Sequence, residues 1–124
     1  MSVSFAAVVL GSPDPPALAA FYRELLGWDT VEESPGWVRL RDPRRERPGL
    51  SVQLEPPQVP PAWPAAAGEP QMQLHLDLLS DDLDADVARA VALGASLEAD
   101  QPQEDVRVLR DPDGHPFCLF LPGA

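Results

Sequence analysis

The sequence predicts an α+β fold in which two tandem βαβββ modules form a curled mixed sheet. Three short matches between the halves of the 124-residue chain point to this architecture. One tetrapeptide, Leu40-Arg41-Asp42-Pro43, recurs at residues 109–112. A Ser-x-Asp triplet occurs at residues 12–14 and 80–82, and a Leu-Gly pair occurs at residues 26–27 and 93–94. The offsets of 69, 68 and 67 residues keep the same order, which indicates a duplicated module.

The first module begins with an apolar strand over Phe5–Gly11 and continues into a helix. Asp14 stands where an N-cap belongs, and Pro15 follows at the first helical position, where its missing N–H costs nothing. Gly27 supplies the left-handed stop. The apolar residues between them recur at helical spacing: Leu18, Phe21, Tyr22, Leu25 and Leu26.

Three strands complete the first module, over Trp28–Glu33, Trp37–Arg41 and Leu50–Glu55. A Ser-Pro-Gly turn at residues 34–36 separates the first two, and the charged loop 42–49 leads to the third. The arginines of this region are interpreted as a solvated loop: Arg39, Arg41, Arg44, Arg45 and Arg47.

The second module repeats the pattern. A strand is predicted over Met72–Leu79, and Asp82 caps a helix that ends at Gly94. The apolar stripe of this helix is Leu83, Val87 and Val91. Three strands are predicted to follow, over Ser96–Ala99, Val106–Arg110 and Pro116–Leu121, with a Pro-Gly turn at residues 111–114 before the last.

The chain is predicted to form one domain over residues 1–124, because its length fits a single core. Module 1 covers about residues 1–56 and module 2 about residues 71–124. A crossover rich in Pro and Ala, at residues 56–70, connects them and carries Trp63. This indole is expected either to pack on the sheet or a partner subunit, or to contact a ligand. The alternative architecture is a ferredoxin-like sandwich with fewer strands in each repeat.

Charge and composition exclude several classes of function. The formal net charge is −11, and such a field repels nucleic acid and anionic lipid. The chain has no lysine, which excludes a Schiff-base mechanism. A single cysteine, Cys118, excludes an intrachain disulfide and is expected to be an inert buried side chain. With neither a signal peptide nor an apolar span, a cytoplasmic location is expected.

Two motifs resemble the vicinal oxygen chelate superfamily, which includes glyoxalase I, bleomycin-resistance proteins and extradiol dioxygenases. The first is the helix end Phe21-Tyr22-Arg23-Glu24-Leu25-Leu26-Gly27-Trp28, and the second is Arg110-Asp111-Pro112-Asp113-Gly114-His115-Pro116-Phe117. The resemblance covers essentially the whole chain. It implies paired βαβββ modules that curl into an open half-barrel, often completed in a homodimer. His115, within the second motif, is interpreted as a turn residue.

Metal-dependent members of that superfamily place one ligand on the first strand and one on the last strand of each module. Carried over to this chain, the resemblance puts these positions at Ala7, Gln53, His75 and Cys118. Ala7 has no donor atom, which leaves a weak neutral amide, an imidazole and a soft thiol. Alternation along the strands places these three on the inner wall of the cup, together with Asp77.

These observations leave several functions open. The chain is expected to bind a small molecule, cationic in view of the net charge, in a cup-shaped pocket without a cofactor. The residues expected to contact this ligand are Gln53, His75, Asp77, Cys118, Trp37 and Trp63. A bleomycin-resistance-type protein would use such a pocket to sequester a drug.

Enzymatic alternatives use the same residues. A metal-dependent lyase, isomerase or dioxygenase would hold a zinc, nickel, iron or manganese ion with His75, Gln53 and Cys118. A non-metal enzyme would use His75 as its acid or base. In each case a homodimer is expected, because an open half-barrel leaves sheet edges exposed, and neither nucleic acid nor a membrane is expected as a partner.

Overall fold

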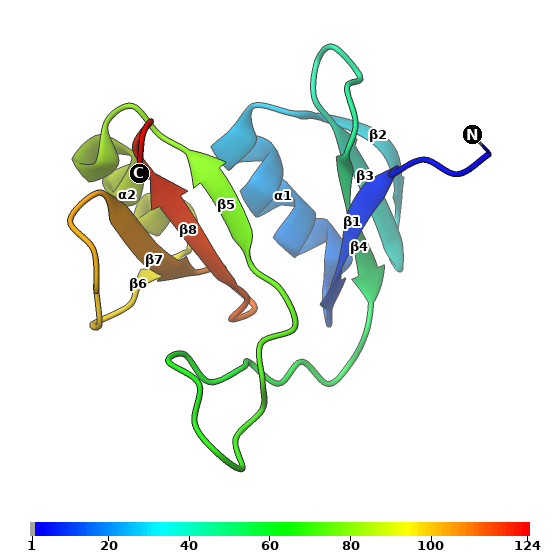
Figure 1. Ribbon diagram of the computed structural model, residues 1–124. Helices are drawn as coiled ribbons and strands as arrows, with labels where there is room; N and C mark the ends of the chain where they lie inside the picture. Colours follow the sequence, from blue (N-terminus) through cyan, green and yellow to red (C-terminus); the bar gives the residue numbers. More distant parts are fainter. Residues whose placement is uncertain (1) are drawn as a thin grey trace. The chain divides into compact units, whose positions relative to one another are not determined.

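Two units of the same design make up the structure, a computed structural model that describes residues 2–124 (Figure 1). The first unit reaches to Gln58, and the second runs from Val59 to Ala124. Each contains one helix and four strands in the order βαβββ, so the predicted α+β class and tandem modules are confirmed. The ferredoxin-like alternative is wrong, because each repeat carries a fourth strand. Residues 59–70 of the crossover belong to the second unit.

In the first unit, α1 (Pro15–Leu26) packs on one face of a mixed sheet (Figure 1). The strands are β1 (Ala7–Ser12), β2 (Asp29–Ser34), β3 (Trp37–Arg41) and β4 (Gly49–Leu54). They lie in the order β1-β4-β3-β2, with β1 and β4 parallel and the other neighbours antiparallel. The fully buried core includes Leu18, Tyr22, Val38, Leu40 and Val52.

The second unit repeats this topology. Its elements are β5 (Leu76–Leu79), α2 (Leu83–Leu93), β6 (Ser96–Leu97), β7 (Val106–Arg110) and β8 (Pro116–Phe120). The strands lie in the order β5-β8-β7-β6, and β5 is parallel to β8. Ala90, Leu109 and Phe117 are fully buried in its core.

The same local structure starts both helices. In α1, the Asp14 carboxylate accepts a hydrogen bond from the N–H three residues further on at 3.4 Å, and its own N–H donates to Ser12 Oγ at 3.0 Å. In α2, Asp82 and Ser80 make the equivalent bonds at 3.1 Å each. Both serines are buried. The Ser-x-Asp triplet is therefore a helix start that the two units share.

The helices differ in the faces that they bury. Gly27 ends α1 in the left-handed conformation, with φ of 69°, as predicted. In α2 the predicted stripe is only partly right: Leu83 is buried, but Val91 is 45% exposed and the small Ala90 faces the core in its place. Neither helix in residues 2–124 is long and apolar enough to cross a membrane.

Strand boundaries follow the pairing registers. The predicted bounds of β3 and β7 are confirmed. The strand predicted over Met72–Leu79 is too long, because pairing between β5 and β8 begins only at Leu76 and Phe117. Likewise β1 begins at Ala7, where its pairing with β4 begins, and not at Phe5. Two other strands are shifted by one residue: the strand predicted over Trp28–Glu33 is observed over Asp29–Ser34, and that predicted over Leu50–Glu55 is observed over Gly49–Leu54. Two more are shorter than predicted: the strand expected over Ser96–Ala99 ends at Leu97, and that expected over Pro116–Leu121 ends at Phe120.

The crossover is irregular, yet side chains of the second sheet hold it. The Ala62 N–H donates to the Pro70 carbonyl at 2.8 Å, which closes a loop. Arg110, on β7, donates to the Pro61 carbonyl at 2.6 Å and pairs with Glu98 at 2.8 Å. These bonds attach the crossover, and with it Trp63, to the second sheet.

Candidate functional site

A cavity of about 320 Å³ opens on one face of the second sheet. The register aligns Asp77, Cys118 and Val108 in one row across β5, β8 and β7. Because side chains alternate along a strand, this row points away from the face where Leu109 and Phe117 are buried. The cavity is lined by Trp63, His75, Asp77, Pro102, Gln103, Val106, Val108, Cys118, Phe120 and Ala124.

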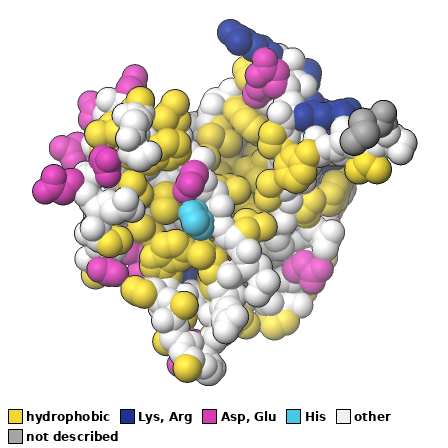
Figure 2. Space-filling model, viewed as in Figure 1, with side chains coloured by type: hydrophobic (Ala, Val, Ile, Leu, Met, Phe, Trp, Pro, Cys, Tyr) yellow, Lys and Arg dark blue, Asp and Glu magenta, His cyan; other side chains and the backbone are white. Residues whose placement is uncertain are grey.

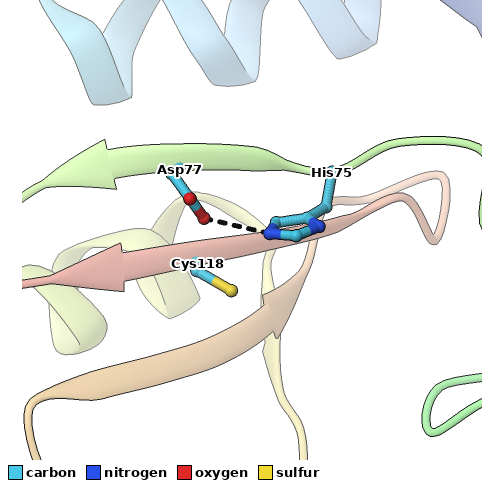
Figure 3. A group of neighbouring side chains, drawn as sticks. All are labelled: His75, Asp77 and Cys118. Carbon is cyan, nitrogen blue, oxygen red and sulfur yellow. Dashed lines mark ion pairs between the residues drawn. The ribbon is translucent and has the colours of Figure 1, made fainter.

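His75 is held from two sides at this cavity. It lies one residue before β5, and its Nε2 is 3.1 Å from Asp77 Oδ1 (Figure 3). The Trp63 ring meets the imidazole edge to face, with centroids 5.2 Å apart and an interplanar angle of 84°. A carboxylate that accepts from one ring nitrogen fixes the orientation of a histidine. The second nitrogen is left for a ligand or a proton transfer, and the acid-base role of His75 stays a prediction.

Cys118 lies beside this pair, on the neighbouring strand β8 (Figure 3). Burial, then the negative charge of Asp77 and a hydrogen bond to its carboxylate, raise the pKa of the thiol to about 11. Asp77 therefore accepts hydrogen bonds from both the imidazole and the thiol. A thiol with this pKa is protonated at neutral pH and is a poor nucleophile.

The architecture agrees with a comparison against known families. The family model described as "Glyoxalase-like domain" matches residues 7–120, which is nearly the whole chain. The chain belongs to the glyoxalase-like domain family. The resemblance to the vicinal oxygen chelate superfamily is thereby confirmed. No curated protein matches the chain.

Solved structures share the fold of this glyoxalase-like domain. A glyoxalase/bleomycin resistance protein/dioxygenase family enzyme from Burkholderia phytofirmans PsJN is 21% identical, with a TM-score of 0.71 over 96% of this chain and 98% of that one. A glyoxalase-related enzyme from Fulvimarina pelagi is 22% identical, with a TM-score of 0.68 over 95% and 87%. Lactoylglutathione lyase from Agrobacterium tumefaciens is 20% identical, with a TM-score of 0.63 over 96% and 93%. At these identities the likeness establishes the fold.

The donor set at the cavity of the glyoxalase-like domain fits a zinc ion. The ligand atoms that His75, Asp77 and Cys118 offer all lie within 4.8 Å of one another. Zinc binds imidazole, carboxylate and thiolate, and a catalytic zinc site uses three protein ligands. This set differs from the predicted one in one member: it contains Asp77, whereas the predicted set contained Gln53. When bound, zinc would supply Lewis acidity or an activated water.

The first unit does not offer the equivalent donors. The register places Ser51, not Gln53, at the last-strand position, in a row with Val9 and Arg39. Gln53 lies two residues further along and donates to the Glu55 carboxylate at 2.8 Å. In the register, the counterpart of Cys118 in the first unit is therefore Ser51, and contact of Gln53 with a ligand or metal stays a prediction. Ala7, at the start of β1, supplies no donor atom.

The two tryptophans predicted to contact a ligand lie in different units. Trp63 lines the cavity and packs on His75, and its contact with a ligand stays a prediction. Trp37 lies on β3, and its Nε1–H donates to Glu32 at 3.2 Å. Its contact with a ligand stays a prediction.

His115 stabilises a turn. Its Nδ1 is 2.8 Å from the buried carboxylate of Asp111, which also accepts from the backbone N–H groups of Asp113 and His115. The interpretation of His115 as a turn residue is confirmed by this geometry.

Sequence reasoning missed two sets of residues. The apolar lining of the cavity, Val106, Val108 and Phe120, was not assigned, although strand alternation puts Phe120 on the face of Cys118. The interpretation of the arginines as a solvated loop is wrong for Arg39 and Arg41. They lie on β3, where they alternate with the buried Val38 and Leu40.

Proposed function

We propose that this glyoxalase-like domain binds a small cationic or amine-bearing organic molecule in the cavity of its second unit, without a resident metal ion. The carboxylate of Asp77 carries the proposal, because it lines the cavity with 60% of its side chain exposed. A cationic nitrogen that reaches it is attracted by the opposite charge, and one that carries N–H groups also gains a charge-assisted hydrogen bond.

The charge of the second unit supports a cationic ligand. Residues 59–124 contain twelve of the 20 acidic residues and only three of the 9 arginines. Acidic and hydrophobic side chains border the histidine exposed on the surface in Figure 2. A field of one sign raises the local concentration of ligands of the opposite sign.

The cavity walls support an organic ligand in place of a bare ion. The indole of Trp63 contacts the His75 ring, which pairs with Asp77. Val106 and Phe120 add apolar surface to the cavity wall. An aromatic face attracts a cation by about 0.5–2 kcal/mol, which adds to the attraction of the carboxylate. The volume of about 320 Å³ suits a small ligand.

The protonated thiol favours the metal-free form. Zinc binds the thiolate, so that binding at neutral pH has to expel a proton from a group whose pKa is about 11. It also has to displace the two hydrogen bonds that Asp77 accepts. An organic cation can bind the exposed part of the carboxylate and leave both bonds in place.

The test compares a cation with a neutral molecule of similar shape. We expect calorimetry to show binding of benzyltrimethylammonium and much weaker binding of benzyl alcohol. The isosteric variant Asp77→Asn should raise the Kd of the cation by roughly tenfold or more. The control Asp81→Asn removes the same charge from an exposed position that does not line the cavity and should change the Kd by less than about twofold. Equal binding of the two probes, or an unchanged Kd in Asp77→Asn, would contradict the proposal.

A zinc enzyme is the second candidate, favoured by the His75–Asp77–Cys118 donor cluster. Here Cys118→Ala separates the two functions. If the cavity is a zinc site, the variant loses zinc binding measured by calorimetry. If it is a metal-free pocket, the variant binds benzyltrimethylammonium at least as well as the wild type, because Asp77 loses a competing hydrogen-bond donor.

We also propose a homodimer, supported by the exposed apolar side chain of Leu79 on edge strand β5. Leu79 is 66% exposed on this strand, whose outer edge has no partner among residues 2–124. Light scattering at micromolar concentration should give twice the mass of the chain, and a monomer would contradict the proposal.

A further inference from the structure

A second cavity lies in the first unit, and its chemistry is opposite to that of the first. It has a volume of about 260 Å³ and opens on the sheet face away from the buried Val38 and Leu40. Its polar lining consists of Trp37, Arg39, Arg41, Arg47 and Ser51. Basic side chains gather over the β3–β4 loop and beside the N-terminal segment (Figure 2).

Two of the three guanidinium groups have neutral partners. Arg39 pairs with Glu32 at 3.2 Å. Arg41 Nη2 instead donates to the Arg45 carbonyl, and Arg47 Nη1 donates to Ser4 Oγ at 3.2 Å. The positive charges of Arg41 and Arg47 are therefore not compensated by an ion pair within residues 2–124.

Arg41 also carries a buried donor without a partner. Its Nε is buried and makes no hydrogen bond among the described residues. A buried, unsatisfied donor is unfavourable, and more so when it belongs to a charged group. An oxyanion bound at the guanidinium group would supply the missing negative charge.

Gly49 provides the space in which Arg41 lies. A Cβ atom at this position would stand 2.8 Å from Arg41 Cδ and 3.3 Å from Arg41 Nε. Any side chain on Gly49 would therefore push the guanidinium group out of its place across β4. Glycine at position 49 therefore leaves room for the Arg41 side chain beside β4.

We propose that this cavity binds the oxyanion of a small organic acid or ester, a carboxylate or a phosphate, through Arg41 and Arg47. Arginine presents its N–H groups in a planar fork that matches both oxyanions. The indole of Trp37 forms the flat wall against which an aromatic or apolar part of the ligand packs. The residues that line this cavity all belong to the first unit, whereas those of the cation site belong to the second.

The test uses the full chain with benzoate and with inorganic phosphate as probes. We expect calorimetry at low ionic strength to show binding of at least one of them with a Kd below about 1 mM. Tighter binding of benzoate would identify a carboxylate with an aromatic body, and tighter binding of phosphate would identify a phosphate group. Absence of binding by both up to about 10 mM would overturn the proposal.

Three variants locate the binding. Arg41→Gln should raise the Kd by roughly tenfold, and Gly49→Ala should raise it by a similar factor without changing the charge of the protein. Arg44→Gln is the matched control, because Arg44 is exposed and does not line the cavity. If Arg41→Gln and Arg44→Gln raise the Kd by the same factor, the anion is attracted only by the overall positive charge of this region, and the proposal is overturned. Arg41→Lys keeps the charge and should recover only part of the affinity, which separates loss of the fork from loss of the fold.

Failure of this proposal is distinguishable from failure of the cation site. Asp77→Asn should leave the Kd for benzoate and phosphate unchanged, and Arg41→Gln should leave the Kd for benzyltrimethylammonium unchanged. Anion binding that disappears in Asp77→Asn would show that the oxyanion does not bind where Arg41 lies.

Discussion

The two units share a backbone design but carry opposite charges on corresponding sheet faces. In the first unit the middle row reads Val9, Ser51 and Arg39, and in the second it reads Asp77, Cys118 and Val108. Core and caps are alike, whereas this row, on the sheet face away from the helix, differs at every position. The duplication thus preserved what folds each unit, while the side chains on the opposite sheet face changed.

The largest effect should come from the core that the units share. Leu40 and Leu109 are equivalent in the repeat, and both are 0% exposed. Replacing either with Ala should lower the free energy of unfolding by about 2–5 kcal/mol, because the cavity cannot fully collapse. Leu54→Ala and Leu97→Ala, at positions 48% and 47% exposed, should cost less than about 1 kcal/mol in guanidinium denaturation. Similar costs at buried and exposed positions would show that the described core does not stabilise the units.

A thiol should react differently at equivalent positions of the two units, near Asp77 at position 118 and opposite Arg39 at position 51. The pKa of Cys118 is raised from 9.0 to about 11, so at pH 8 its thiolate fraction should be about a hundredfold below that of an unperturbed cysteine. Alkylation by iodoacetamide should be slower by a similar factor. Ser51→Cys in a Cys118→Ser background places a similarly buried thiol opposite Arg39, so that a positive neighbour replaces Asp77, and it should react faster than Cys118. A slower reaction at position 51 would contradict the comparison.

The same pKa predicts how stability depends on pH. Since the folded state holds the Cys118 proton more tightly than the unfolded state, this group stabilises the fold fully below pH 9 and loses its effect between pH 9 and about 11. The wild type should therefore lose stability over that range relative to Cys118→Ser, which has no thiol to titrate. Denaturation midpoints of both proteins, measured at pH 7, 9 and 11, provide the check. Parallel curves would show that Cys118 is not perturbed by its surroundings.

Sequence patterns predicted what depends on neighbours along the chain. The duplication, the caps Asp14 and Asp82, and the strands 37–41 and 106–110 follow from local residue types and repeats. Strand alternation also placed Cys118 and Asp77 on an open face, where the cavity lies. These features need no knowledge of which strand pairs with which.

What the sequence did not predict depends on register. The late start of β5 follows from where Phe117 meets Leu76, and the Asp77–Cys118 contact follows from the same parallel pairing. Register also explains why Ser51, not Gln53, corresponds to Cys118. The arginines on β3 are a different case, because their alternation with buried residues was visible in the sequence and was outweighed by the charged loop that follows.

The smallest effect concerns the two caps. Asp14→Ala and Asp82→Ala should each cost about 1 kcal/mol in the free energy of unfolding, because a helical N–H loses its acceptor. The two losses should differ by a few tenths of a kcal/mol. In α1 no other acid occupies the first turn, so Asp14 alone complements the positive end of the helix dipole.

In α2, by contrast, Asp84 and Asp86 remain after Asp82 is removed, and the repulsion among three neighbouring carboxylates is relieved. Asp14→Ala should therefore be the more costly change at low ionic strength. Salt screens both the dipole interaction and the repulsion, so the difference should shrink toward zero in about 1 M NaCl, while the hydrogen-bond part of each loss persists. A difference that survives high salt would assign it to hydrogen-bond geometry, which at 3.4 Å in α1 and 3.1 Å in α2 predicts the opposite order.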